Sequence, residues 1–174
     1  MYTCVVNSEL IITLLFFKLK KIDNIMNDST FVKNIMKDSV VAIDSSMTIK
    51  DAAEMMDDAE IGGIVVMENN TATGIITERD VVRRIVAKKK GYSTKLKDVM
   101  STPLITISPD ETVWELAQLM KVKKIHRVPV TRGSKLVGMV TTTDLARICS
   151  VGSNTELSKI TEQILLRMKN SDQK

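Results

Sequence analysis

A seven-residue motif of glycine, threonine and aspartate occurs twice in this chain. Its copies are Gly74–Asp80 (GIITERD) and Gly138–Asp144 (GMVTTTD). An apolar pair followed by T-x-x-D is typical of a strand that ends where a helix begins. N–H groups at a helix start bind phosphate, and a carboxylate accepts hydrogen bonds from the two hydroxyls of a ribose. The motif predicts a nucleotide site, or, alternatively, threonines that only cap helices and aspartates that only complement the helix dipole.

Cationic side chains accompany the second copy of the motif only. His126 and Arg127 precede the apolar run Val128–Val130, and a planar guanidinium binds phosphate oxygens in a bidentate manner. The first copy has Gly62 and Gly63 at the equivalent positions. We therefore expect two sites of similar frame but different lining, with unequal affinity for one ligand.

The whole central part of the chain is duplicated with a constant offset of 64 residues. The matched pairs are Met36 and Met100, Thr48 and Thr112, Gly74 and Gly138, Thr77 and Thr141, and Asp80 and Asp144. Because no insertion interrupts the match, the chain contains two copies of one unit. We divide it into an N-terminal extension (1–29), a first repeat (30–90), a second repeat (91–150) and a helical tail (151–174).

Each repeat has the pattern expected of a βαββα unit. A short apolar run at 40–43 or 104–107 suits a buried strand, and T-x-x-D at Thr48 or T-x-x-E at Thr112 predicts a helix start. The expected core-facing stripes are Ile49, Ala52, Ala53 and Met56, and Val113, Leu116, Ala117 and Met120. Two strands joined by a turn follow, at 64–67 and 73–76 or at 128–130 and 137–140. A last helix then begins after Thr77 or Thr141, with apolar positions Val81, Val82, Ile85 and Val86, or Leu145, Ala146 and Ile148.

Composition excludes several classes of protein. The 174 residues are 44% hydrophobic and 26% charged, as in soluble globular chains, and the net charge of +4 falls short of a dedicated nucleic-acid binder. One histidine and two distant cysteines give no support to a zinc site or a disulfide framework. We expect a cytoplasmic protein with neither nucleic acid nor a membrane as its partner.

Two segments outside the repeats carry separate expectations. The apolar run 10–17 is much shorter than the ~20 residues that cross a bilayer, and no basic residue precedes it. We interpret residues 1–25 either as an extension upstream of the true start, Met26, or as an element that covers an apolar edge. In the tail, Leu157, Ile160, Ile164 and Met168 form an apolar stripe for packing or dimerisation.

Together these segments resemble the tandem CBS domain, also called a Bateman module. The resemblance spans roughly residues 30–150 and rests on VKNIM and LKDVM, IGGIVV and IHRVPV, and GIITERD and GMVTTTD, all in register. It implies an α/β (α+β) fold of two βαββα repeats about a pseudo-twofold axis, with two clefts that bind adenosine-containing ligands. It also implies a homodimer and no catalysis.

The resemblance carries a set of ligand-binding residues onto this sequence. Asp80 and Asp144 are expected to bind ribose, and Thr77, Thr141 and Thr143 to lie near phosphate. Ala42, Ile43 and Asp44, and Thr106, Ile107 and Ser108, are expected to border the adenine, with Ile64, Val65, Val128 and Pro129 as its apolar wall. His126 and Arg127 are expected to contact phosphate. Because Glu78 replaces a small hydroxyl residue, phosphate binding in the first repeat departs from the family pattern.

The function we expect is regulatory. No P-loop, G-x-S-x-G or complete triad occurs in the sequence. No cofactor is required; the ligand is AMP, ADP, ATP or S-adenosylmethionine, and its binding signals to an unknown effector protein through a conformational change. The alternative is a nucleic-acid or membrane-associated adaptor that uses basic patches at Arg83, Arg84 and Lys88–Lys90 together with the N-terminal apolar run.

Overall fold

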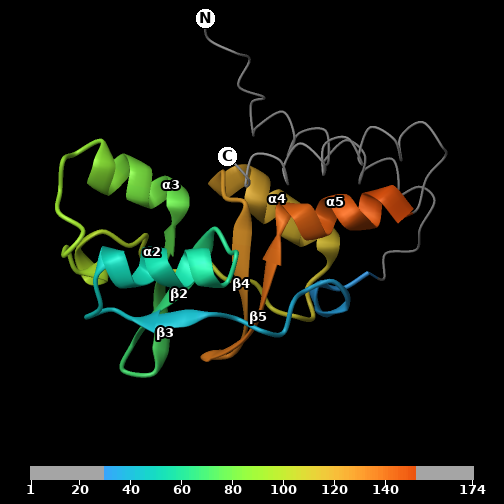
Figure 1. Ribbon diagram of the computed structural model, residues 1–174. Coiled ribbons are helices and arrows are strands. Elements are labelled where there is room, and N and C mark those ends of the chain that lie inside the picture. Colours follow the sequence, from blue (N-terminus) through green and yellow to red (C-terminus); the bar gives the residue numbers. More distant parts are fainter. Residues whose placement is uncertain (1–29, 152–174) are drawn as a thin grey trace, which may run out of the picture. The chain divides into compact units, whose positions relative to one another are not determined.

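The computed structural model describes residues 30–151, which form a mixed α+β structure of short strands and helices (Figure 1). The run 10–17 and the tail stripe lie outside these residues. Two compact units are formed: within the described chain, the first contains 38–106 and 129–138, and the second contains 30–37, 107–128 and 139–151. The division of the chain into domains that we drew from the sequence stays a prediction.

The first unit is built on a three-stranded sheet in the order β1-β2-β3. Strand β1 (Ala42–Asp44) is parallel to β2 (Gly63–Glu68), which is antiparallel to β3 (Thr71–Thr77). The β2–β3 turn uses Asn69 and Asn70 with positive φ, at 48° and 61°, as a tight hairpin turn requires. The two strands and the turn expected here are confirmed.

Helix α2 (Ile49–Asp58) covers one face of this sheet, as Figure 1 shows. Its start is stabilised by a capping box, in which Thr48 Oγ1 accepts from the Asp51 N–H and the Asp51 carboxylate accepts from the Thr48 N–H. Buried side chains of α2 pack with those of the strands and of the following segments; this cluster comprises Ile43, Ile49, Ala52, Met56, Ile64, Val66, Ile76, Ile85, Leu96 and Val99. Ala53, expected in the stripe, is exposed, because it lies beyond the edge of the narrow buried face.

The last helix of the first repeat is not a regular α-helix. Helix α3 (Glu78–Asp80) continues as a π-helical segment, η2 (Val81–Val86), in which the Ala87 N–H bonds to the Val82 carbonyl. The wider turn changes which residues face inward: Ile85 is buried, but Val82 and Val86 are 58% and 66% exposed. The apolar positions of this helix therefore divide, with Ile85 in the core and Val82 and Val86 at the surface.

The start of the second repeat, residues 95–101, belongs to the first unit and packs on elements of the first repeat. Residues 96–98 form the 3-10 helix η3 (Leu96–Asp98), Lys95 bridges Thr48, and Ser101 bridges Ile75. A Cβ at Gly74 would lie 3.0 Å from the Ser101 carbonyl oxygen. The glycine of the repeated motif is therefore explained here by the close approach of this segment.

In the second unit, the start of the first repeat packs on elements of the second repeat. Residues of the 3-10 helix η1 (Val32–Asn34) bond to the carbonyls of Glu111 and Pro109, and Lys37 bridges Met139. Helix α4 (Val113–Lys123) starts in a capping box of Thr112 and Glu115. Its expected stripe, Val113, Leu116, Ala117 and Met120, is buried throughout.

Strands β4 (Arg127–Arg132) and β5 (Lys135–Thr141) pair as a hairpin, and helix α5 (Thr142–Val151) follows. Leu145 and Ala146 of α5 are buried, as expected. The strand expected at 104–107 is not formed: the Leu104 N–H bonds to the Thr73 carbonyl, and only an isolated bridge occurs at Ile107. Pro103, just before this segment, lacks the N–H that a ladder would need.

Candidate functional site

The threonine and aspartate of the repeated motif form the same hydrogen-bonded box in both repeats. Asp80 Oδ2 accepts from Thr77 Oγ1 at 2.6 Å and from the Thr77 N–H at 3.1 Å. Asp144 Oδ2 accepts from Thr141 Oγ1 at 2.6 Å and from the Thr141 N–H at 2.9 Å. The capping interpretation of T-x-x-D is thus confirmed, and it accounts for one of the two carboxylate oxygens of each aspartate.

The second oxygen of each carboxylate lies beside an arginine. Asp80 Oδ1 is 3.2 Å from Arg84 Nε, and Asp144 Oδ1 is 3.3 Å from Arg147 Nη1. The Asp144 side chain is only 2% exposed and that of Asp80 is 15% exposed. Ribose binding stays a prediction, and the geometry restricts it to Oδ1, because Oδ2 already accepts two hydrogen bonds.

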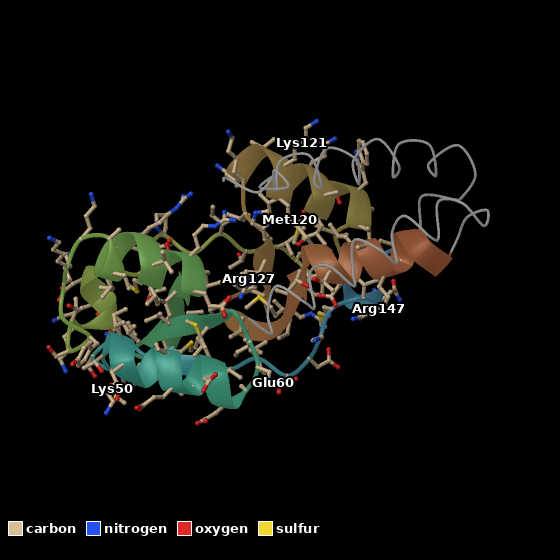
Figure 2. All side chains as sticks on the ribbon, turned by 45° about the horizontal axis from the view of Figure 1, so that its top comes forward. Lys50, Glu60, Met120, Lys121, Arg127 and Arg147 are labelled. Carbon is tan, nitrogen blue, oxygen red and sulfur yellow. The ribbon has the colours of Figure 1, made fainter. Side chains whose placement is uncertain are left out.

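A backbone hydrogen bond ties the helix start to the strand entrance of the same repeat. The Thr142 N–H donates to the His126 carbonyl at 2.9 Å, and the Glu78 N–H donates to the Gly62 carbonyl at 3.3 Å. His126 and Arg127 therefore lie next to the start of α5. Both side chains are half-buried, and Figure 2 marks Arg127, on β4, and Arg147, on α5. The backbone of the segment with both cations therefore adjoins the helix start that carries Asp144, and a shared binding site stays a prediction.

The ligand residues predicted on strands β1 and β2 lie on opposite faces of the three-stranded sheet. Ala42 pairs with Val65, so these two side chains share a face. Ile43 and Ile64 lie on the opposite face, in the core, with 6% and 0% exposure. Their side chains fill the core beneath α2. On the other face Ala42 is exposed, whereas Val65, expected in the adenine wall, is also buried, with 0% exposure.

Asp44, at the end of β1, is exposed and holds a local turn. Its Oδ1 accepts from the hydroxyl and the N–H of Ser46. These hydrogen bonds, that of the hydroxyl first, lower the pKa of Asp44 below its ordinary value of 3.8. Asp44 therefore stays ionised at neutral pH.

The remaining predicted residues belong to the second repeat. Ile107 and Val128 are buried at 3% and 0% exposure, and Pro129 is also buried. Thr106, Ser108, Thr141 and Thr143 are half-buried. Their side chains are therefore partly accessible, whereas Ile107 and Val128 contribute to packing.

An open pocket of about 420 Å³ lies in the first unit. Its lining consists of Thr71, Ala72, Thr73, Thr102, Pro103, Leu104, Thr106, Thr131, Gly133 and Ser134. Thr106 is the one predicted ligand residue in this lining. The pocket therefore does not collect the residues that the motif singled out.

Arg84 is the residue at this site that the sequence analysis did not assign. Its guanidinium contacts the carboxylate of Asp80, the Val99 carbonyl at 2.6 Å and Ser101 Oγ at 2.9 Å. The signal was the i, i+4 spacing of Asp80 and Arg84 on one helix. The two distant partners left no local signal.

Within residues 30–151, no three histidine, cysteine, aspartate or glutamate side chains gather where a metal ion could bind. In the same part of the chain, every helix is too short or too polar to cross a bilayer.

Comparison with known proteins identifies the family. The CBS domain model matches residues 32–87 and 96–150. The chain is 31% identical over 134 residues to the CBS domain-containing protein YhcV of Bacillus subtilis, a match that covers 76% of this chain and 96% of YhcV. It is 31% identical over 150 residues to the mitochondrial CBS domain-containing protein CBSX3 of Arabidopsis thaliana, covering 79% and 73% of the two chains.

Solved structures agree with this assignment. The CBS domain pair of protein MJ0100, in complex with 5′-methylthioadenosine and S-adenosyl-L-methionine, superposes with a TM-score of 0.66 at 27% identity. The match covers 71% of this chain and 98% of that one. With two matched copies of the domain, a shared fold and the duplicated T-x-x-D box, the chain belongs to the CBS-domain family as a CBS pair.

Proposed function

We propose that this CBS pair is a non-catalytic regulatory module that binds an adenosine-containing ligand at the strand-to-helix turns of its repeats. The observation that carries the proposal is the duplicated box, which holds Asp80 and Asp144 by Oδ2 and directs Oδ1 away from the threonine. A carboxylate so held is preorganised to accept from a ribose hydroxyl. The adenosyl ligands of the MJ0100 pair support this class of ligand.

The second repeat is the stronger candidate for a phosphate-bearing ligand. His126 and Arg127 adjoin the start of α5 through the bond from the Thr142 N–H, whereas Gly62 and Gly63 occupy the equivalent place in the first repeat. A guanidinium interacts favourably with phosphate charge. We therefore propose AMP, ADP or ATP for the second repeat, with S-adenosylmethionine as the competing ligand.

Melting temperatures with AMP, ADP, ATP, S-adenosylmethionine and guanosine test the proposal. A ligand at 100 times its dissociation constant stabilises the folded state by about 2.7 kcal/mol. We expect at least one adenosyl compound to raise the melting temperature and guanosine to leave it unchanged. Equal behaviour of all five would contradict the proposal.

The variant Asp144→Asn separates binding from folding. Its amide oxygen can still accept from Thr141, while its NH₂ group replaces Oδ1 and can only donate. We expect affinity for the stabilising ligand to fall at least about tenfold, since a hydrogen bond to a charged group contributes about 1.5–3 kcal/mol. Asp110→Asn is the control, because this exposed carboxylate pairs with Lys33 and lies outside the motif. Equal losses in both variants would remove Asp144 from the site.

We also propose that the chain is a homodimer. Val82, Val86 and Val122 are 58%, 66% and 72% exposed, and burial of such side chains between copies is favourable. Light scattering at tens of micromolar is the test: twice the monomer mass is expected, and a monomer mass at every concentration would refute the dimer.

A second candidate function rests on the charges beside the same valines. Arg79, Arg83 and Lys88–Lys90 are exposed next to Val82 and Val86, a combination that also suits an adaptor for nucleic acid or an anionic membrane surface. Binding to duplex DNA or to anionic vesicles that weakens steeply with salt would favour it. The absence of such binding, together with a ligand-induced rise in melting temperature, would favour the regulatory module.

A further inference from the structure

Arg84 joins two parts of the first unit that are far apart in the sequence. Through Nε it contacts Asp80 Oδ1 at 3.2 Å, and through Nη1 and Nη2 it donates to the Val99 carbonyl at 2.6 Å and to Ser101 Oγ at 2.9 Å. All three guanidinium nitrogens therefore have acceptors. The first acceptor is the carboxylate of the repeated motif, and the other two belong to the segment Val99–Ser101 at the start of the second repeat.

Each end of this connection is itself held in place. Asp80 Oδ2 is fixed by the hydroxyl and the N–H of Thr77. Ser101 exchanges two backbone hydrogen bonds with Ile75, at 2.8 and 3.1 Å. Arg84 therefore joins two groups that are each held by hydrogen bonds independent of it.

The residue equivalent to Arg84 in the second repeat is apolar. Sixty-four residues after Arg84 stands Ile148, whose side chain has no hydrogen-bonding group. Asp144 is contacted instead by Arg147, the counterpart of Arg83, whose side chain is 62% exposed. The backbone differs as well: Arg84 lies in the π-helical segment η2, whereas α5 is α-helical. π-Helical turns within α-helices are frequent at functional positions.

We propose that Arg84 is a positioning residue that transmits the state of the Asp80 carboxylate to the segment Val99–Ser101. A hydroxyl that binds Oδ1 shares this acceptor with Arg84 Nε and draws on the same negative charge. The contact of Arg84 with the carboxylate, and with it the contacts with Val99 and Ser101, therefore changes when the carboxylate is occupied. This inference rests on the proposed function for the identity of the occupant, a ribose diol. The connection between Asp80 and Ser101 through Arg84 stands without it.

A double-mutant cycle tests the connection between Asp80 and Ser101. Its variants are Asp80→Asn and Arg84→Met, and the measured quantity is the rate of amide hydrogen exchange of Ser101 and Ile75 without ligand. Asp80→Asn keeps an oxygen for Thr77 but removes the acceptor for Arg84. Each single variant should speed exchange at these two amides, by about tenfold for Arg84→Met, since two hydrogen bonds from a charged group are lost. The double variant should exchange no faster than Arg84→Met alone. Additive effects would overturn the proposal.

Two further variants show whether the effect is specific to the guanidinium of Arg84. Arg83→Met is the matched control, because Arg83 is the neighbouring, exposed arginine, and it should leave both exchange rates within about twofold of the original. Arg84→Lys keeps the charge but replaces the planar fork with one nitrogen, and it should retain the fold with intermediate exchange. If Arg84→Lys exchanged at the original rates, the three contacts of the guanidinium would not be what protects these amides.

Adenosine and 2′-deoxyadenosine then separate this inference from the proposed function. Adenosine should alter the exchange of Ser101 in the original protein and not in Arg84→Met, and 2′-deoxyadenosine, which lacks the diol, should alter neither. Coupling in the mutant cycle without any adenosine effect would support the Arg84 connection and count against ligand binding at this repeat. An equal adenosine effect in Arg84→Met would overturn Arg84 as the transmitting residue.

Discussion

Enlarging Gly74 tests whether the start of the second repeat packs on strand β3 of the first repeat. A Cβ at this position would lie 2.6 Å from Met100 Sδ and 3.0 Å from the Ser101 carbonyl oxygen. The flexible Met100 side chain can move, but the Ser101 backbone is tied to Ile75 by two hydrogen bonds. The cost of a larger residue therefore falls mainly on this backbone contact.

The magnitude follows from three contributions. Overpacking costs about 1–3 kcal/mol, weakened backbone hydrogen bonds about 0.5–1.5 kcal/mol each, and loss of the glycine stabilises by about 0.4–1 kcal/mol through the unfolded state. For Gly74→Val we expect a net loss of about 2 kcal/mol, and for Gly74→Ala about half of that. In a domain of this size such a loss lowers the melting temperature by about 4–8 °C for valine.

Urea denaturation of Gly74→Val and Gly91→Ala is the assay. Gly91 is the matched control, because a Cβ there meets its nearest atom, Ser93 Oγ, at 3.6 Å. Its stability should stay unchanged or rise slightly. Equal unfolding midpoints for Gly74→Val and Gly91→Ala would refute the close packing of residues 100 and 101 on β3.

Two further predictions concern charge. Arg127→Ala should weaken ATP binding at least about tenfold and adenosine binding little, since a guanidinium acts on phosphate charge; calorimetric titration with both ligands decides this, and equal losses would remove Arg127 from the phosphate site. The pKa of Glu115 lies below its ordinary value of 4.5, because the carboxylate accepts hydrogen bonds first from the N–H and then from the hydroxyl of Thr112. The ionised Glu115 therefore stabilises the fold fully above that ordinary value, and this contribution is lost as the pH falls through the lower pKa of the folded state. The stability difference between the original protein and Glu115→Gln should therefore shrink from about pH 6 to about pH 3, and urea titrations that showed it growing would contradict the capping contact.

Local interactions determined much of this structure from the sequence alone. The capping boxes at Thr48 and Thr112 join residues three positions apart, and the turn at Asn69 and Asn70 depends on residues that tolerate positive φ. The constant 64-residue offset reveals the duplication without any coordinates. These features were predictable because their energies arise within a few residues of chain, or from direct comparison of two copies.

Tertiary structure alone decided which distant segments meet. The bridges of Phe31 with Thr112 and of Lys95 with Thr48 place each leading segment against the other repeat's helix start, and no local pattern distinguishes this from packing within one repeat. The same holds for Arg84, whose spacing from Asp80 was visible but whose contacts with Val99 and Ser101 depend on the fold. Periodicity gives the apolar side of a helix, but how much of that side is covered depends on what packs against it. Val82 is an example, because its apolar side chain is exposed.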